Sequence, residues 1–443
     1  MTRHGSVVTW MIGGALLVAG SVGPTRIATA EPAGRWADTW VAMPQLTEPG
    51  NLPPPPFTSQ TGVFLDSTIR QTLHVTVGGS ELRVRFSNAF GDTPLVVTAA
   101  HLALPADGAV GSRAIRMASD RTLTFQGRSS VTIPAGAQAV SDPLRLAVSP
   151  AENLAVTIYL ARGQPSLNIT SHPGSRTTIY MLAGNHVSDL DLPGAAQVAH
   201  WYFLSGVEVV TDPATFGVVM LGDSLTDGRG STTNQNDRWP DQLATRLRAH
   251  RGTHDVAVLN QAAGGNRILN DGLGPNLLAR LDRDLLAHSG ARWTIVFEGV
   301  NDIGTADATP DAQRAVGDAI IRAYEQIIVR AHDRGIAVYG ATLTPLEGSF
   351  YTDAAGLREA TRQTVNHWIR TSGGFDAVID FDRAARDPDD PITIAPAFDS
   401  GDHLHLNPAG YQALAAAVDL GLFRVRPDGR ALLDRSDREL GEP

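Results

Sequence analysis

A change in hydrophobic period near residue 211 constrains this chain more than any other feature. Through residues 31–210, apolar and polar residues alternate with a period of two, as in strands with one buried face. From Phe216 onward, short apolar runs alternate with segments whose apolar residues recur every three or four positions. A length of 443 residues accommodates two domains. We therefore predict an all-β domain at residues 31–211 and an α/β domain at residues 215–425.

In the first region, apolar residues alternate with polar ones through 73–77 and again through 82–86, on either side of Gly78-Gly79. Period-two alternation across a glycine pair predicts a β-hairpin with one buried face. The same alternation returns at 154–160, and turn clusters at 105–108 and 134–136 separate short runs. We interpret this region as an antiparallel sandwich of jelly-roll type.

The pattern of the second region predicts strands that alternate with helices. Buried strands are predicted at 216–221, 256–260, 293–298, 336–342 and 377–381, and helices at 239–247, 276–288, 310–334 and 354–372. The longest helix has Thr309 as candidate N-cap, Pro310 at its first position and Gly335 just past its end. Such alternation predicts a doubly wound parallel sheet in a flavodoxin-like three-layer α/β/α fold. Ligands of such sheets bind in the loops that follow the strands.

The N-terminal 30 residues have the pattern of an export signal. Arg3 and His4 precede an apolar stretch at 7–22, and Ala28-Thr29-Ala30 gives small residues at the expected cleavage site. The stretch is short for a spanning helix, which needs roughly 20 residues, and an uncleaved anchor is the alternative. Residues 426–443 are charged and turn-rich, and we interpret them as a C-terminal tail. We expect the mature protein to be secreted, extracellular or periplasmic, without stable membrane association.

Composition excludes several classes of chemistry. The chain has 36 basic and 46 acidic residues and a net charge of −10 without a basic run, which argues against a nucleic-acid partner. It has no cysteine, so disulfides, thiol nucleophiles and cysteine-ligated metals are excluded. All 36 basic residues are arginine, which excludes a Walker-type lysine and Schiff-base chemistry.

Four polar clusters follow the predicted strands or precede the last helix. They are Gly222-Asp-Ser-Leu-Thr-Asp-Gly228, Asn260-Gln-Ala-Ala-Gly-Gly-Asn266, Gly299-Val-Asn-Asp302 and Asp402-His-Leu-His405. These clusters resemble the four sequence blocks of the SGNH (GDSL) hydrolases, in the same order, across residues 216–423. The resemblance implies a serine esterase built on a parallel sheet.

Ester cleavage by a serine needs a base, a group that orients the base, and donors for the developing oxyanion. Ser224 follows a tight strand-to-helix turn, His405 is the candidate base, and Asp402 stands three residues before it. The resemblance implies direct contact between His405 and Asp402. It also implies an oxyanion hole made by the backbone N–H groups of Ser224 and Gly265 and the side-chain amide of Asn301.

Each assignment has a structural alternative. Ser224 could cap the following helix, Gly264 could replace Gly265 as the donor, and Asn301 could cap a loop. His403 could be the base, although an extended segment would turn it away from His405. The remaining acidic residues of the blocks are interpreted as turn, capping or structural groups: Asp223, Asp227, Glu298 and Asp302.

A metal site is a further alternative. Asp399, Asp402, His403 and His405 form a compact cluster of zinc-type ligands, but no His-x-x-x-His helix accompanies them. A metal would also leave Ser224 unexplained, so we predict no metal and no organic cofactor. The common α/β-hydrolase elbow is disfavoured because Thr226 stands where its second glycine belongs.

We expect a secreted esterase that removes short acyl groups, acetyl above all, from carbohydrate esters. The alternatives are a lipase or broad acyl esterase, and a catalytically inactive carbohydrate-binding protein. Segments 36–40 and 85–91 are similar to the xylanase-associated (XynE-like) branch of SGNH enzymes, although Leu406 stands where many relatives have proline. Six residues of the first domain either line a sugar-binding surface or lie on the solvent-exposed face of strands: Trp36, Trp40, Arg70, Arg83, Arg85 and Asn88.

Overall fold

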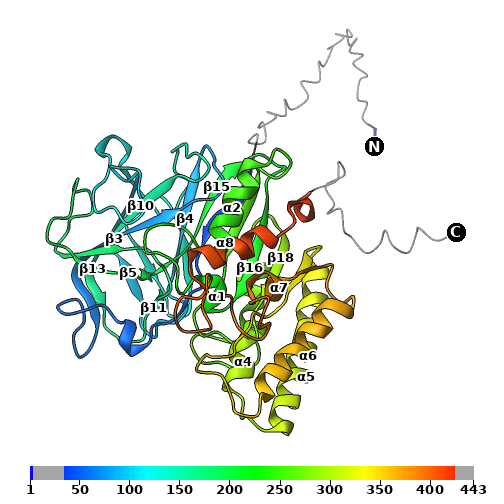
Figure 1. Ribbon diagram of the computed structural model, residues 1–443. Coiled ribbons are helices and arrows are strands. Elements are labelled where there is room, and N and C mark those ends of the chain that lie inside the picture. Colours follow the sequence, from blue (N-terminus) through cyan, green and yellow to red (C-terminus); the bar gives the residue numbers. More distant parts are fainter. Residues whose placement is uncertain (3–33, 425–443) are drawn as a thin grey trace. The chain divides into compact units, whose positions relative to one another are not determined.

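The strands of the first region are antiparallel, as the alternating pattern predicted (Figure 1). One sheet has the order β1(Arg35–Val41), β15(Leu204–Thr211), β4(Leu82–Ser87), β9(Gln138–Val140). A second has the order β13(Ala196–Val198), β12(Ile179–Ala183), β3(Val63–His74), β10(Asn153–Gln164), β6(Ala99–Ala103), β7(Arg121–Thr122). Smaller sheets join β14(Trp201–Tyr202), β11(Thr170–His172) and β2(Gln45–Leu46), and β5(Leu95–Val97) with β8(Val131–Ile133).

This computed structural model describes residues 1–2 and 34–424. The predicted export signal and C-terminal tail lie outside the described residues. Residues 34–424 belong to one compact unit. Among the described residues, none of the helices combines the length and the hydropathy needed to cross a lipid bilayer.

The predicted hairpin around Gly78-Gly79 is wrong. β3 ends at His74 and β4 begins at Leu82, but they belong to different sheets, and β4 pairs with β15 and β9. Gly79 instead bridges Val148, and a Cβ on Gly78 would lie 2.5 Å from the Val148 carbonyl oxygen. The glycines therefore permit close passage beside another backbone segment while the chain crosses between sheets.

The second region contains the predicted parallel sheet. Its order is β17(Val256–Asn260), β16(Phe216–Gly222), β18(Ala291–Phe297), β19(Ala337–Ala341), β20(Ala377–Ile379), and all neighbours are parallel. The chain moves outward from β16 in one direction and then in the other, so the switch point lies beside β16. Loops after β16, β17 and β18 therefore meet at one edge, where such sheets bind ligands.

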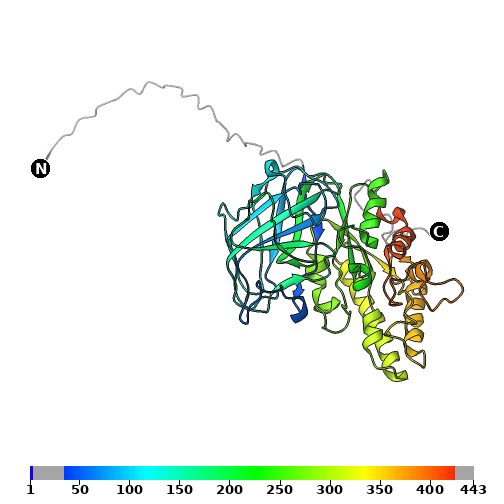
Figure 2. The ribbon, with the colours of Figure 1, turned by 60° about the vertical axis from the view of Figure 1, so that its left-hand side comes forward.

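The helices pack in two groups. α2(Trp239–Ala249) contacts α8(Pro408–Ala417), whereas α5(Pro310–His332) contacts α3(Leu277–Leu281) and α6(Leu357–Thr371). α5 and α6 lie side by side in both ribbon views (Figures 1 and 2). Right-handed crossovers place α2 on one face of the sheet and α3, α5 and α6 on the other. Shorter helices are α1(Ser224–Asp227), α4(Val300–Thr305) and α7(Phe381–Ala385).

The predicted start of the longest helix is confirmed, whereas the predicted extent of the helix at 276–288 is wrong. Thr309 caps α5 by accepting a hydrogen bond from the Ala312 N–H, and Gly335 lies just past its end with φ +67°. The helix predicted at 276–288 is shorter, because α3 passes into a π-helical turn at Asp282–Leu286. There the buried Asp284 carboxylate accepts from the buried Arg280 guanidinium.

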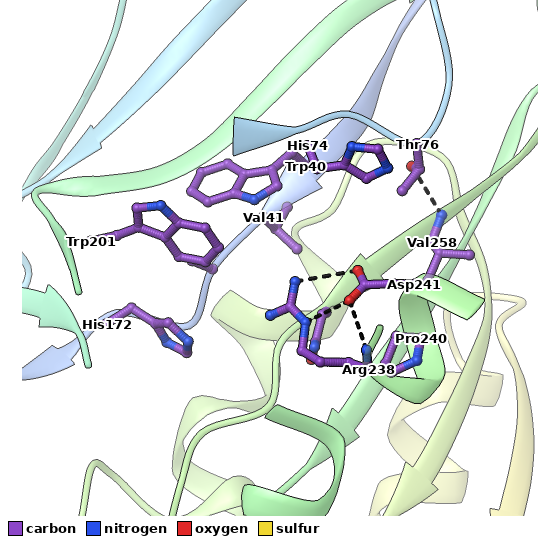
Figure 3. A pocket seen from close by; sticks show the side chains of 12 residues that line it. Trp40, Val41, His74, Thr76, His172, Trp201, Arg238, Pro240, Asp241 and Val258 are labelled. Carbon is purple, nitrogen blue, oxygen red and sulfur yellow. Dashed lines mark hydrogen bonds and ion pairs between the residues drawn. The ribbon is translucent and has the colours of Figure 1, made fainter. Parts of the chain in front are cut away.

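Polar contacts join the antiparallel region to the parallel sheet. Thr76 Oγ accepts a hydrogen bond from the Val258 N–H in β17 at 3.2 Å (Figure 3). The Asp38 carboxylate of β1 lies 3.1 Å from His288 Nδ1 and also accepts from the Ser289 N–H. These contacts fix the antiparallel region beside the sheet that carries the polar clusters.

Candidate active site

Ser224 stands on a sharp turn at the end of β16. A Cβ on Gly222 would lie 2.4 Å from Thr226 Oγ and 2.8 Å from the Phe297 carbonyl oxygen, so only glycine fits there. Asp223 caps α1 by accepting from the Leu225 N–H at 2.9 Å. The capping role therefore belongs to Asp223, and the Ser224 hydroxyl is directed elsewhere.

The loop before α8 brings an imidazole to that hydroxyl. Ser224 Oγ lies 2.8 Å from His405 Nε2, and His405 Nδ1 lies 2.7 Å from Asp402 Oδ2. Asp402 Oδ1 also accepts the backbone N–H groups of His405 at 2.8 Å and Leu404 at 3.2 Å. Ser224 is 6% exposed and His405 is 3% exposed, so little water competes for the bond between them. Three residues from two distant segments thus form one hydrogen-bonded relay.

The electrostatics suit proton transfer from the serine. Burial alone would raise the pKa of Asp402, but hydrogen bonds from the backbone and side chain of His405 outweigh it and bring the pKa to about 2. Burial lowers the pKa of His405 below its usual 6.5, although Asp402 partly opposes this. At neutral pH the carboxylate is therefore ionised and the imidazole neutral. Its Nδ1–H then donates to Asp402, and Nε2 can accept the Ser224 proton.

Two backbone N–H groups are available for an oxyanion. The Gly264 N–H already donates to Asp227 Oδ2 at 3.0 Å. In the part of the chain that the structure describes, no hydrogen bond takes the N–H of Ser224 or of Gly265. Gly265 has φ +72°, a left-handed conformation that glycine adopts without strain. The geometry therefore favours Gly265 over Gly264 as the second donor.

The Asn301 side chain is fixed on both sides. Its Nδ2 donates to the Asn266 carbonyl at 2.9 Å, and its Oδ1 accepts from the Tyr351 hydroxyl at 2.9 Å. One N–H of the amide is left for a ligand, and Asn301 is 5% exposed. The sequence motifs did not single out Tyr351, which sets the orientation of this amide.

A buried arginine supports the loop that carries Gly265. Arg280 donates to the Asn266 side chain at 2.9 Å and to the Gln261 carbonyl at 2.6 Å. It also lies 3.3 Å from the Glu298 carboxylate, whose pKa burial raises to about 8. Asp302 accepts the N–H groups of Ile268 and Leu269 from the same loop. Glu298 and Asp302 thus make framework contacts.

The Asp and His residues near the C-terminus separate into two pairs. His403 Nδ1 lies 2.7 Å from Asp399 Oδ2, while His405 is bonded to Asp402 and Ser224. His403 turns away through a left-handed conformation with φ +60°, not through the extended backbone we expected. Within residues 34–424, no three His, Asp or Glu side chains form a group that could hold a metal ion.

A cavity of about 510 Å³ opens over Ser224. Its lining includes Ser224, Gly265, Asn301 and His405, together with Phe350 and Tyr351 from the segment between β19 and α6. The antiparallel region supplies another wall: Gln45, Glu48, Asn51, Pro173, Gly174, Arg176 and His200. These wall residues carry no local motif, so no sequence pattern pointed to them.

The six candidates from the first domain lie elsewhere. None lines the cavity over Ser224. Arg70 and Asn88 are fully buried, so they belong neither to a sugar-binding surface nor to a solvent-exposed strand face. Arg83 stacks over Trp36 and pairs with Glu208, and Arg85 pairs with Asp38. Trp40 borders a separate cavity of about 30 Å³ (Figure 3).

Residues 220–413 match the model of the GDSL-like Lipase/Acylhydrolase family. The matched part of the chain is similar to domains of that family, and the protein is a carboxylic ester hydrolase. No curated protein matched the chain.

Several solved structures are similar to part of it. An acetylxylan esterase from Geobacillus stearothermophilus is 18% identical and covers 46% of this chain and 91% of its own, with a TM-score of 0.35. The acetyl xylan esterase AlAXEase is 18% identical over 46% of this chain and 97% of its own, with a TM-score of 0.34. A GDSL-like lipase from Bacteroides thetaiotaomicron is 15% identical over 47% and 87%, with a TM-score of 0.34.

Proposed function

We propose that this protein is a serine esterase that removes short acyl groups, above all acetyl, from carbohydrate esters. Ser224 attacks the ester carbonyl carbon while His405 Nε2 takes its proton, and the carbonyl π electrons move onto oxygen. The N–H groups of Ser224, Gly265 and Asn301 stabilise that oxyanion. His405 then protonates the leaving sugar oxygen as the tetrahedral intermediate collapses, and water hydrolyses the acyl-serine by the same route. The observation that carries this proposal is the relay of 2.8 Å and 2.7 Å at the base of the cavity.

The cavity wall supports a polar leaving group. The Glu48 carboxylate accepts from the side-chain amides of Gln45 and Asn51, so it is held in place beside the cavity. His200 Nδ1 donates to the Pro173 carbonyl, which leaves Nε2 as an acceptor. Such groups suit the hydroxyls of a sugar better than an acyl chain.

An exposed aromatic ring supports the same class of substrate. Phe350 lines the cavity and is 67% exposed, and its ring centroid lies 4.4 Å from that of Tyr351. An exposed ring beside polar groups can pack against the apolar face of a sugar ring while its hydroxyls are bonded. A lipase would instead need a long apolar channel beside Ser224.

Acetate release from a panel of acetylated polysaccharides tests the proposal. We expect release by the parent protein, with or without EDTA, and none above background by Ser224→Ala. Equal activity of Ser224→Ala, or loss of parent activity in EDTA, would overturn the mechanism. A series of nitrophenyl esters tests the acyl group, and activity that peaks at eight carbons or longer would favour the lipase. A parent protein that binds acetylated xylan but releases no acetate would favour the inactive binding protein.

The organisation of the chain is part of the same proposal. We propose a signal peptide at residues 1–30, a jelly-roll-like accessory domain at 31–211, a catalytic domain at 215–425 and a tail at 426–443. Secretion and kinship with the xylanase-associated branch fit an enzyme that meets polymeric substrate outside the cytoplasm. Recovery of the protein from the culture medium with Glu31 as its first residue tests the signal.

A further inference from the structure

A histidine of the antiparallel region reaches the helix that begins at Ser224. His172, at the end of β11, has its Nε2 3.0 Å from Asp227 Oδ1. Asp227 is the last residue of α1, and its other oxygen accepts the Gly264 N–H at 3.0 Å. One carboxylate thus links the antiparallel region, the helix of Ser224 and the loop that continues into Gly265.

His172 is held in place by its own region. Its Nδ1 lies 3.0 Å from the Met43 carbonyl oxygen, and its ring stacks on Trp201 with centroids 5.7 Å apart. Trp201 in turn meets Trp40 edge to face at 4.9 Å. Figure 3 shows Trp40, Trp201 and His172 in succession along one side of the small cavity.

The hydrogen-bond partners of His172 show how many protons the pair of His172 and Asp227 must carry. A carbonyl oxygen only accepts, so Nδ1 must carry a hydrogen toward Met43. The bond to Asp227 then needs a second proton, either on Nε2 or on the carboxyl. His172 is 3% exposed and Asp227 is 1% exposed, so this contact is shielded from water. Within residues 34–424, His172 is the hydrogen-bond partner of Asp227 Oδ1, so its removal would leave that buried oxygen without a donor.

A glycine beside His172 also fits Asp227. A Cβ on Gly174 would lie 1.7 Å from Asp227 Oδ2. Only glycine at position 174 therefore lets the backbone of residues 173–175 approach the Asp227 carboxylate this closely. The nearby cation Arg238 is itself paired with Asp241 at 2.7 Å, so it does not replace His172.

We propose that His172 is a positioning residue for the oxyanion hole, acting through Asp227 and Gly264 on the Gly265 N–H. This inference rests on the proposed function and extends it: the antiparallel region is part of the catalytic apparatus. Oxyanion contacts strengthen in the transition state, so loosening them lowers kcat and leaves KM nearly unchanged. A residue that served stability alone would alter the melting temperature and not kcat of the folded protein.

The test measures kcat and KM for nitrophenyl acetate on purified, folded variants. We expect His172→Leu to lower kcat about 10–100-fold, somewhat less than outright loss of a donor. His172→Gln, which keeps a donor toward Asp227, should recover part of that loss. Asp227→Asn should lower kcat less than Asp227→Ala does, because its amide can donate to neutral His172 while its oxygen accepts from Gly264.

A double-mutant cycle makes the test specific. Adding His172→Leu to Asp227→Ala should cost little more than Asp227→Ala alone, because both residues act through one contact. The matched control is His101→Leu, which removes a His–Asp pair of 2.9 Å to Asp120 within the antiparallel region and should leave kcat unchanged. If His172→Leu does not fold, Gly174→Ala displaces the same carboxylate and should lower kcat likewise.

Parental kcat in His172→Leu, or additive losses in the cycle, would overturn the inference if Ser224→Ala is inactive. Activity retained by Ser224→Ala would instead overturn the proposed function. The two failures are therefore distinguishable.

Discussion

The hydrogen bond between Tyr351 and Asn301 allows a graded test of the oxyanion hole. Tyr351→Phe keeps the ring that lines the cavity and removes only the hydroxyl that donates to Asn301 Oδ1 at 2.9 Å. Such a bond contributes about 0.5–1.5 kcal/mol net. If that energy orients the amide in the transition state, kcat should fall about 2–12-fold at 1.36 kcal/mol per factor of ten.

Asn301→Ala removes the donor itself and should lower kcat about 10²–10³-fold. Both variants are assayed with nitrophenyl acetate over a range of concentrations that defines kcat and KM separately. We expect KM to stay within about twofold in both, because the amide contributes mainly in the transition state. A larger loss in Tyr351→Phe than in Asn301→Ala, or full activity in Asn301→Ala, would refute the role of this amide.

Three further predictions concern the base and the framework. The pKa of His405 is lowered, and only its neutral form accepts a proton. Therefore kcat/KM should rise with pH, and the midpoint of this rise should lie below pH 6.5. A midpoint above pH 7 would contradict this. Gly222→Ala should lower the free energy of unfolding by about 1–3 kcal/mol, measured by urea denaturation, because its Cβ meets Thr226 and the Phe297 carbonyl. Arg280→Met should lower the free energy of unfolding by about 1–3 kcal/mol in the same assay, because the buried Asn266 side chain and Gln261 carbonyl lose their donor while Arg283 still pairs with Asp284; an unchanged midpoint would count against those contacts.

Local patterns predicted the parallel sheet better than the antiparallel sheets. The run at 256–260 coincides with β17, because a parallel strand whose two faces are both covered is apolar on both faces, and this pattern can be recognised without knowing which strand it pairs with. Alternation at 82–86 likewise identified β4, whose Leu82, Val84 and Phe86 are fully buried. It could not identify the partner: β4 pairs with β15, more than a hundred residues later. Period two fixes which face of a strand is buried and leaves its neighbours open.

The candidate site divides in the same way. The polar clusters after β16, β17 and β18 were visible because a fold with parallel strands places their carboxyl ends at one edge. His172, Glu48 and Tyr351 had no such signal, because each reaches the site through contacts between segments distant in sequence. The π-helical turn at Asp282–Leu286 was missed because helix periodicity does not register one inserted residue.

Covalent labelling by a nitrophenyl phosphonate tests the central claim most directly, because the reagent reacts fastest with a serine that is activated and faces an oxyanion hole. We expect one phosphonyl group per protein, located on Ser224 by peptide mass spectrometry, with nitrophenol released in equal amount. In His405→Ala the labelling should be slowed by orders of magnitude. A label on another residue, or ester hydrolysis that survives with Ser224 unlabelled, would contradict the account.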